Sequence, residues 1–149
     1  MNRLLDHFAY LLAIAWVGAL WATGGLTAPV LFHNIPDKMQ AGALAGQMFT
    51  WLAYFGMGSA LVLLVIRLAN DGMHALKQGY FWIIVLMLLL VLAGQLGIQP
   101  ILAKLKAMAF PADVMQSMFA DRFRHWHGVA SIAYLIECLL GVALVFKAR

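Results

Sequence analysis

The sequence predicts an all-α polytopic membrane protein: one domain, residues 1–149, in which four transmembrane helices form an up-down bundle. Hydrophobic residues make up 64% of the chain and charged residues 11%, whereas soluble domains are about half apolar and about a quarter charged. Four windows together hold a single formal charge, that of Glu137. These windows are residues 7–36, 39–66, 78–103 and 125–146. This distribution excludes a soluble globular protein and a disordered chain.

The apolar windows fit helices rather than the strands of a membrane barrel. Each window exceeds the roughly 20 residues with which a helix crosses a bilayer. The run Ile83–Leu92 also lacks the apolar–polar alternation of a barrel strand. The four helices are expected at residues 8–32, 45–67, 79–103 and 126–146, in an order that leaves both termini on one side of the membrane.

Prolines and one aspartate mark the expected ends of these elements. Pro29 is expected to kink or end the first helix, because proline lacks an N–H and its ring clashes with the preceding turn. Pro36 closes the first loop, and Asp37 is a candidate cap for the approach to the second helix. Pro100 lies near the end of the third helix. Apolar residues at helical spacing over Ala112–Arg124 predict a short amphipathic helix on the membrane surface, between the third and fourth helices.

Small residues recur at spacings of three and four along the predicted helices, and such stripes let helices approach closely in lipid. We expect these stripes to face the interior of a tight bundle. They consist of Ala15, Gly18, Ala22 and Gly25 in the first helix, Ala53, Gly56 and Ala60 in the second, Gly94 and Gly97 in the third, and Gly141 in the fourth.

The predicted location is the inner membrane of a bacterium, with the lipid bilayer as a partner. Basic residues divide evenly between the two sides. The side of the termini carries Arg3, Arg67, Lys77, Lys147 and Arg149, and the other side carries Lys38, Lys104, Lys106, Arg122 and Arg124. The first group lies in shorter segments, so the positive-inside rule favours cytoplasmic termini.

Glu137 lies near the middle of the fourth helix, where an ionisable group is costly and is a candidate for function. His127, Ser131 and Tyr134 fall with it in an arc of about 120° on a helix. One interpretation of this polar stripe is an intramembrane proton or cation site. The alternative is structural: a protonated Glu137 hydrogen-bonds to a neighbouring helix, for example to Ser59 or to a tryptophan indole.

Histidines at the ends of the predicted helices are candidate ligands. His33, His125 and His127 are expected at one membrane face, on the side of Met115 and Met118. Imidazole with thioether suits copper(I), and paired imidazoles such as His33 and His127 suit haem. Positions 125 and 127 are about 200° apart on a helix, so both cannot face one ligand without fraying. The alternative is that these residues lie at the interface and bind no ligand.

The segment Arg122–His127 alternates cations with aromatic rings. This pattern occurs in proteins that bind single-stranded nucleic acid. At the edge of a membrane the same pattern suits lipid headgroups. We therefore expect lipid contacts here and no nucleic-acid partner.

Two blocks of sequence resemble a known family. The first runs from Trp16-Val17-Gly18 through Gly24-Gly25 to the segment Ala28–Phe32, and the second is Arg124–Ser131. Together with four helices, they resemble the bacterial domain of unknown function related to eukaryotic transmembrane protein 205. A more distant likeness is to the CopD-type copper-resistance membrane domain, which favours copper, although this chain has no histidine deep inside a helix. The resemblance singles out Pro29, Phe32, His127, Gly128 and Ser131.

The function predicted from these observations is non-enzymatic. We expect a structural or accessory membrane protein, either a homo-oligomer or a subunit of a larger complex. The sequence contains no Ser-His-Asp set, Walker loop or dinucleotide-binding glycine motif, and no catalytic residue is predicted. Two alternatives stay open: a haem- or copper-binding membrane protein, and a small proton- or cation-coupled transporter that uses Glu137.

Overall fold

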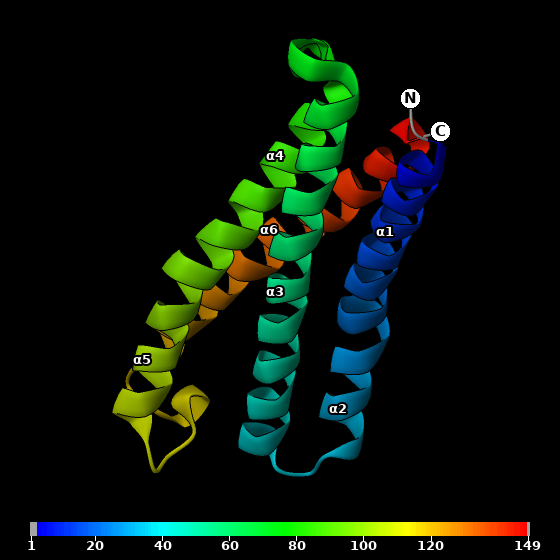
Figure 1. The fold of residues 1–149 in the computed structure, drawn as a ribbon. Helices are drawn as coiled ribbons and strands as arrows, with labels where there is room; N and C mark the ends of the chain where they lie inside the picture. The colour runs from blue at the N-terminus through cyan, green and yellow to red at the C-terminus, as the bar shows by residue number, and fades with distance from the viewer. Residues whose placement is uncertain (1–2, 149) are drawn as a thin grey trace.

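The computed structural model describes residues 3–148, and the predicted all-helical architecture is confirmed (Figure 1). Four helices are long and apolar enough to cross a membrane. They extend over Arg3–Asn34, Lys38–Lys77, Gly79–Ala109 and Ala120–Lys147. All four are longer than the expected spans, and no strand occurs in the described part of the chain.

Three of the four long helices are composite. The first consists of α1 (Arg3–Ala22), the π-helical segment η1 (Thr23–Thr27) and α2 (Ala28–Asn34). The second consists of α3 (Lys38–Asp71) and the 3₁₀ segment η2 (Gly72–Lys77). The third consists of α4 (Gly79–Leu92), the π-helical segment η3 (Ala93–Ile98) and α5 (Gln99–Ala109). A 3₁₀ turn, η4 (Val114–Gln116), precedes the fourth helix, α6 (Ala120–Lys147).

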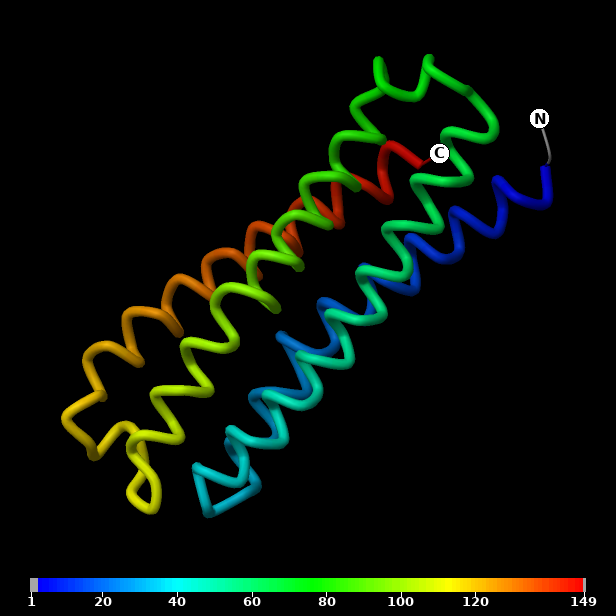
Figure 2. Tube along the Cα trace, turned by 60° about the vertical axis from the view of Figure 1, so that its left-hand side comes forward, coloured from blue at the N-terminus to red at the C-terminus, as the bar shows by residue number. Residues whose placement is uncertain are grey.

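The helices form a four-membered ring in which α1 packs on α3 and α6, and α4 packs on the same two helices. The start of α1 and the end of α6 lie at one end of the bundle, as the even number of helices predicted (Figure 1). We call this the terminal end and the opposite one the loop end. Towards the loop end α2 stays with α3 and α5 stays with α6, and the two pairs diverge (Figure 2).

Both membrane helices that contain a proline widen into a π-helical segment just before it. Pro29 follows η1 and Pro100 follows η3, and each stands in the first turn of the next α-helix. The first helix thus continues to Asn34 instead of ending at Pro29. A π-helical turn relieves the clash between a proline ring and the preceding turn. The Thr27 hydroxyl donates a hydrogen bond to the carbonyl of Ala22, and this gives a further partner to the backbone where α1 passes into η1.

The predicted amphipathic helix over Ala112–Arg124 is wrong. Residues 110–119 form a loop that contains only the single turn η4, and residues 120–124 already belong to α6. The Asp113 carboxylate accepts from the amide of Met115, and the Ser117 hydroxyl accepts from the amide of Phe119. Such side-chain bonds to the local backbone compete with the helical ladder.

The small-residue stripe of the first helix faces outward, which corrects the prediction. Ala15, Gly18, Ala22 and Gly25 are all exposed, and a Cβ added at either glycine would contact nothing within 4 Å. Gly97 is also exposed, and Gly94 is half-buried.

The face of α1 that packs in the bundle carries Ala13, Trp16, Val17 and Leu20. Two of these side chains, Trp16 and Val17, fill notches at glycines of the neighbouring helices. The indole nitrogen of Trp16 lies 2.8 Å from the place of a Cβ on Gly56, and a methyl of Val17 lies 2.9 Å from that place on Gly141. The buried glycines expected on α3 and α6 therefore lie in the core, but they receive large side chains instead of another small-residue stripe.

Asp37 caps α3 as predicted, because its Oδ1 accepts hydrogen bonds from the amides of Met39 and Gln40. We expect Asp37→Ala to lower the free energy of unfolding by about 1 kcal/mol, the usual contribution of such a cap. Asp37→Asn keeps a side-chain acceptor and should stay near the wild type. Unfolding in mixed detergent micelles measures both, and equal losses in the two variants would contradict the capping role.

Candidate functional site

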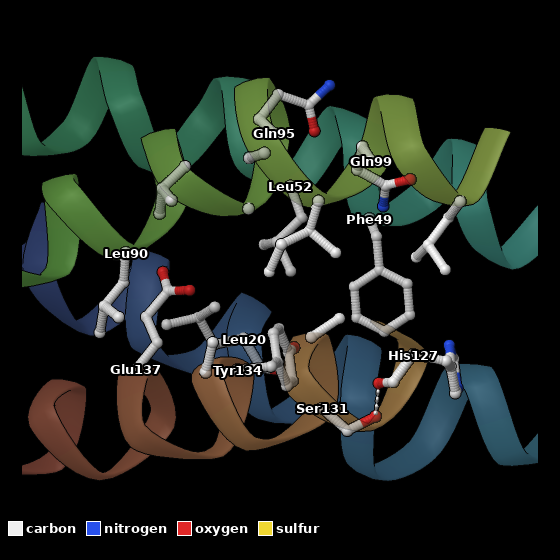
Figure 3. A pocket seen from close by; sticks show the side chains of 17 residues that line it. Leu20, Phe49, Leu52, Leu90, Gln95, Gln99, His127, Ser131, Tyr134 and Glu137 are labelled. Atoms are coloured by element: carbon white, nitrogen blue, oxygen red, sulfur yellow. Dashed lines mark hydrogen bonds between the residues drawn. The ribbon is translucent and has the colours of Figure 1, made fainter. Parts of the chain in front are cut away.

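A cavity of about 170 Å³ lies where the two helix pairs diverge, and we call it the loop-end cavity (Figure 3). Its walls come from all four long helices and are mostly apolar, with Leu20, Phe49, Leu52 and Leu90 among them. Six side chains in the wall are polar or titratable. They are His127, Ser131, Tyr134 and Glu137 on α6, and Gln95 and Gln99 on η3 and α5.

Glu137 is the deepest of these polar groups. It is only 6% exposed, and its carboxyl group points into the loop-end cavity (Figure 3). Its Oε1 has no hydrogen-bond partner among the described residues. The predicted bond to Ser59 or to a tryptophan indole is not formed, since the buried Ser59 hydroxyl and the buried Trp16 indole also lack partners there. The carboxyl group is therefore placed at the cavity rather than tied to a neighbouring helix.

Tyr134 holds α6 against the π-helical segment of the first helix. Its hydroxyl donates to the backbone carbonyl of Leu20. The ring lies so close to Gly24 that a Cβ there would overlap it. Tyr134 also packs edge-to-face on Phe49, with 5.1 Å between ring centroids. Gly24, Leu20 and Phe49 thus fix the orientation of Tyr134 in the cavity wall.

The other two members of the predicted stripe lie nearer the mouth of the cavity. Ser131 donates to the carbonyl of His127 within α6, and both residues are exposed. The His127 ring stacks on Phe123 with 5.7 Å between centroids. The stripe predicted from helical angles therefore runs from an exposed histidine to a buried carboxyl along one wall.

Gln95 and Gln99 form the opposite polar wall and were not among the residues predicted from the sequence. Both amides are half-buried and lie across the cavity from α6 (Figure 3). A signal was available: two amides four residues apart share one helix face, and they occur in an otherwise apolar, uncharged window. Hydrogen-bonding groups in such a window are costly unless they find partners or line a polar space.

The predicted metal or haem ligands are spread over different elements. His33 lies in the last turn of α2, and His125 packs edge-to-face on Trp126. Met115 and Met118 are 48% and 91% exposed in the loop before α6. Within residues 3–148, no three His, Cys, Asp or Glu side chains are grouped so that they could hold a metal ion.

The residues singled out by family resemblance lie on both sides of the loop end. Pro29 and Phe32 are exposed on α2, and the Phe32 ring approaches to 3.8 Å from the place of a Cβ on Gly42 in α3. Gly128 is exposed on α6, between His127 and the rest of the cavity stripe. The second motif block thus contributes His127 and Ser131 to the cavity.

Residues 11–111 match the family model described as a domain of unknown function (DUF4149). The chain belongs to this family. The matched region extends from α1 to the loop before η4, so it includes Gln95 and Gln99 and ends before the α6 stripe. Searches of curated proteins and of solved structures found no match.

Proposed function

We propose that this DUF4149 protein is a small proton-coupled membrane carrier in which Glu137 holds either a proton or a small cation. The observation that supports this most is the buried, unpartnered carboxyl group at the loop-end cavity. A lone carboxylate in a low-dielectric interior is unstable, so it must be neutralised by a proton or paired with a cation. Exchange of one for the other at this position is the chemistry that the site can perform.

The size and lining of the cavity favour a small ligand. About 170 Å³ is below the volume of cavities that bind drug-sized molecules. Apolar walls suit a short hydrocarbon body, and the amides of Gln95 and Gln99 can accept hydrogen bonds from an ammonium group across from Glu137. Methylammonium and inorganic monovalent cations are therefore the first probes.

We further propose that the protein lies in a bacterial inner membrane with cytoplasmic termini. In that orientation the loop-end cavity faces the outer side, because it lies toward the end opposite the termini. Reporter fusions to each terminus and to the loop at residues 110–119 test the orientation.

Proton release on cation binding tests the proposal in detergent solution. Methylammonium, tetramethylammonium, Na⁺ and K⁺ chlorides are added separately to weakly buffered protein, and a pH indicator reports released protons. We expect at least one cation to release up to about one proton per chain at saturation, because Glu137 can hold only one of the two species.

Two variants make the assay specific. Glu137→Gln should release no protons. Asp121→Asn makes the same chemical change on an exposed carboxyl of the same helix, outside the cavity, and should behave like the wild type. Release by Glu137→Gln that equals the wild type, or no release with any of the four salts, would reject the carrier proposal.

The other two hypotheses from the sequence stay predictions. An accessory role in a complex or homo-oligomer is tested by native mass spectrometry of the purified protein. Haem or copper binding by His33, His125, His127, Met115 and Met118, which the CopD likeness favours, is tested by an absorbance spectrum and metal analysis. A Soret band or stoichiometric copper would support it.

A further inference from the structure

A second cavity, of about 220 Å³, lies at the terminal end of the bundle. All four long helices contribute to it, and its wall is rich in charged and hydroxyl groups. These are Asp6 and Tyr10 of α1, Arg67, Asn70 and Asp71 of α3, Tyr80 of α4 and Lys147 of α6. We call it the terminal cavity.

Side-chain bonds hold the wall of the terminal cavity in place. Asn70 donates to Asp6 at 2.8 Å and joins α3 to α1. Arg67 lies 3.1 Å from Asp71 and donates to Gln78, at the start of α4. The terminal cavity is therefore a built polar space in the bundle and not a fraying end.

The two cavities lie on one axis. Each long helix contributes residues to both cavities. On every helix, the two residues that face each other across the gap between the cavities are ten positions apart. The pairs are Leu20 and Tyr10, Ala53 and Leu63, Leu90 and Tyr80, and Glu137 and Lys147. Ten residues of helix correspond to about 15 Å. The layer between the cavities thus has one thickness all round, and we call it the plug.

Apart from the buried Cys138 thiol, the plug is apolar except for two buried groups without partners. Large side chains such as Trp16, Ile84 and Met87 fill it. The Ser59 hydroxyl and the Trp16 indole N–H both lie in this layer, are at most 3% exposed, and lack a hydrogen-bond partner among the described residues. Trp16 Nε1 points at α3 beside Gly56, one turn from Ser59 on the same helix. Buried groups of this kind call for an explanation.

We propose that protons cross the membrane along this axis, between Glu137 and the terminal cavity, through water that enters the plug and is bound there by Ser59 and Trp16. This inference rests on the proposed function, because Glu137 is the proton-binding group in the carrier site and in the path. The Glu137 carboxyl gives its proton to a bridging water, and each later carrier accepts one proton and passes one on. The Asp6 carboxylate in the terminal cavity can receive the last one. No other reactant is consumed.

The two groups in the plug favour a proton over a metal or ammonium cation. A serine hydroxyl both donates and accepts, so it can take part in a relay. An indole N–H only donates, so it can orient a water oxygen but repels a bare cation. The path through the plug is therefore expected to carry protons.

Proton flux into liposomes tests the path. The protein is reconstituted into phosphatidylcholine–phosphatidylglycerol vesicles that contain pyranine, with valinomycin and K⁺ to clamp the voltage, and a pH gradient is imposed. Wild type should carry protons faster than protein-free vesicles. Ser59→Ala and Trp16→Phe should each lower this flux about tenfold, equivalent to about 1.4 kcal/mol in the barrier. Thr50→Val and Trp51→Phe remove the same groups from α3 positions outside both cavities and should keep the wild-type flux.

Cation-evoked proton release in detergent separates the path from the proposed function. Ser59→Ala and Trp16→Phe should release protons like the wild type, which also shows that they fold. Normal release with undiminished flux in both variants overturns the path and leaves the carrier site standing. Wild-type flux no greater than that of empty vesicles also overturns the path. The carrier site is supported if Glu137→Gln is the one variant of the three that no longer releases protons in detergent. The path is supported if Glu137→Gln, Ser59→Ala and Trp16→Phe all lose proton flux in liposomes.

Discussion

Glu137→Leu is expected to stabilise the bundle by about 2–3 kcal/mol while it removes cation-evoked proton release. The carboxyl group is 6% exposed, and its Oε1 has no partner in the described chain. An ionisable side chain near the centre of a membrane helix carries a penalty of about this size. Leucine has similar volume and adds apolar contacts with Leu20 and Leu90 in the cavity wall.

Reversible unfolding in dodecyl maltoside–SDS micelles measures the change. Asp121→Leu is the matched control, since the Asp121 side chain is 95% exposed and pairs only with Arg124 among the described residues. Its stability should change by no more than about 0.5 kcal/mol. A variant that gains stability and loses activity shows that a functional requirement keeps the carboxyl group in the core. A loss of more than about 1 kcal/mol in Glu137→Leu would mean instead that the carboxyl group is structurally bonded.

Gly24→Ala is expected to destabilise the protein by about 1–3 kcal/mol, in the range for overpacking a tight contact. The new methyl group would overlap the Tyr134 ring. That ring cannot easily retreat, because its hydroxyl is bonded to the Leu20 carbonyl and Phe49 packs against it. The strain should fall on the contact between η1 and α6.

The neighbouring glycine supplies the control. Gly25 lies in the same π-helical segment, and a Cβ there meets nothing within 4 Å. Gly25→Ala should therefore be neutral or stabilising by up to about 1 kcal/mol. If Tyr134 causes the strain, the Gly24→Ala effect should shrink in a Tyr134→Ala background. Equal effects of the two glycine substitutions would show that the helix backbone, and not Tyr134, sets the cost.

The polar stripe of α6 could be predicted because its members lie on a single helix. Helical angles alone place His127, Ser131, Tyr134 and Glu137 on one face, and the structure places all four in one cavity wall. The opposite wall was missed because Gln95 and Gln99 belong to another helix. Their relation to Glu137 depends on how the third and fourth long helices pack, which no local pattern encodes.

The number of helices and the rarity of intramembrane charge were determined by the sequence itself, because the cost of exposing polar groups to lipid acts on each helix separately. Only the tertiary structure decided which faces turn inward. Lipid and protein interior are about equally apolar, so hydropathy does not distinguish them, and shape complementarity between helices makes the choice. On α1, Trp16 and Val17 face inward because they fit the notches at Gly56 and Gly141, and the stripe of Gly18 and Gly25 lies on the outside. The same packing aligned two cavities on one axis with Glu137 at the edge of the plug.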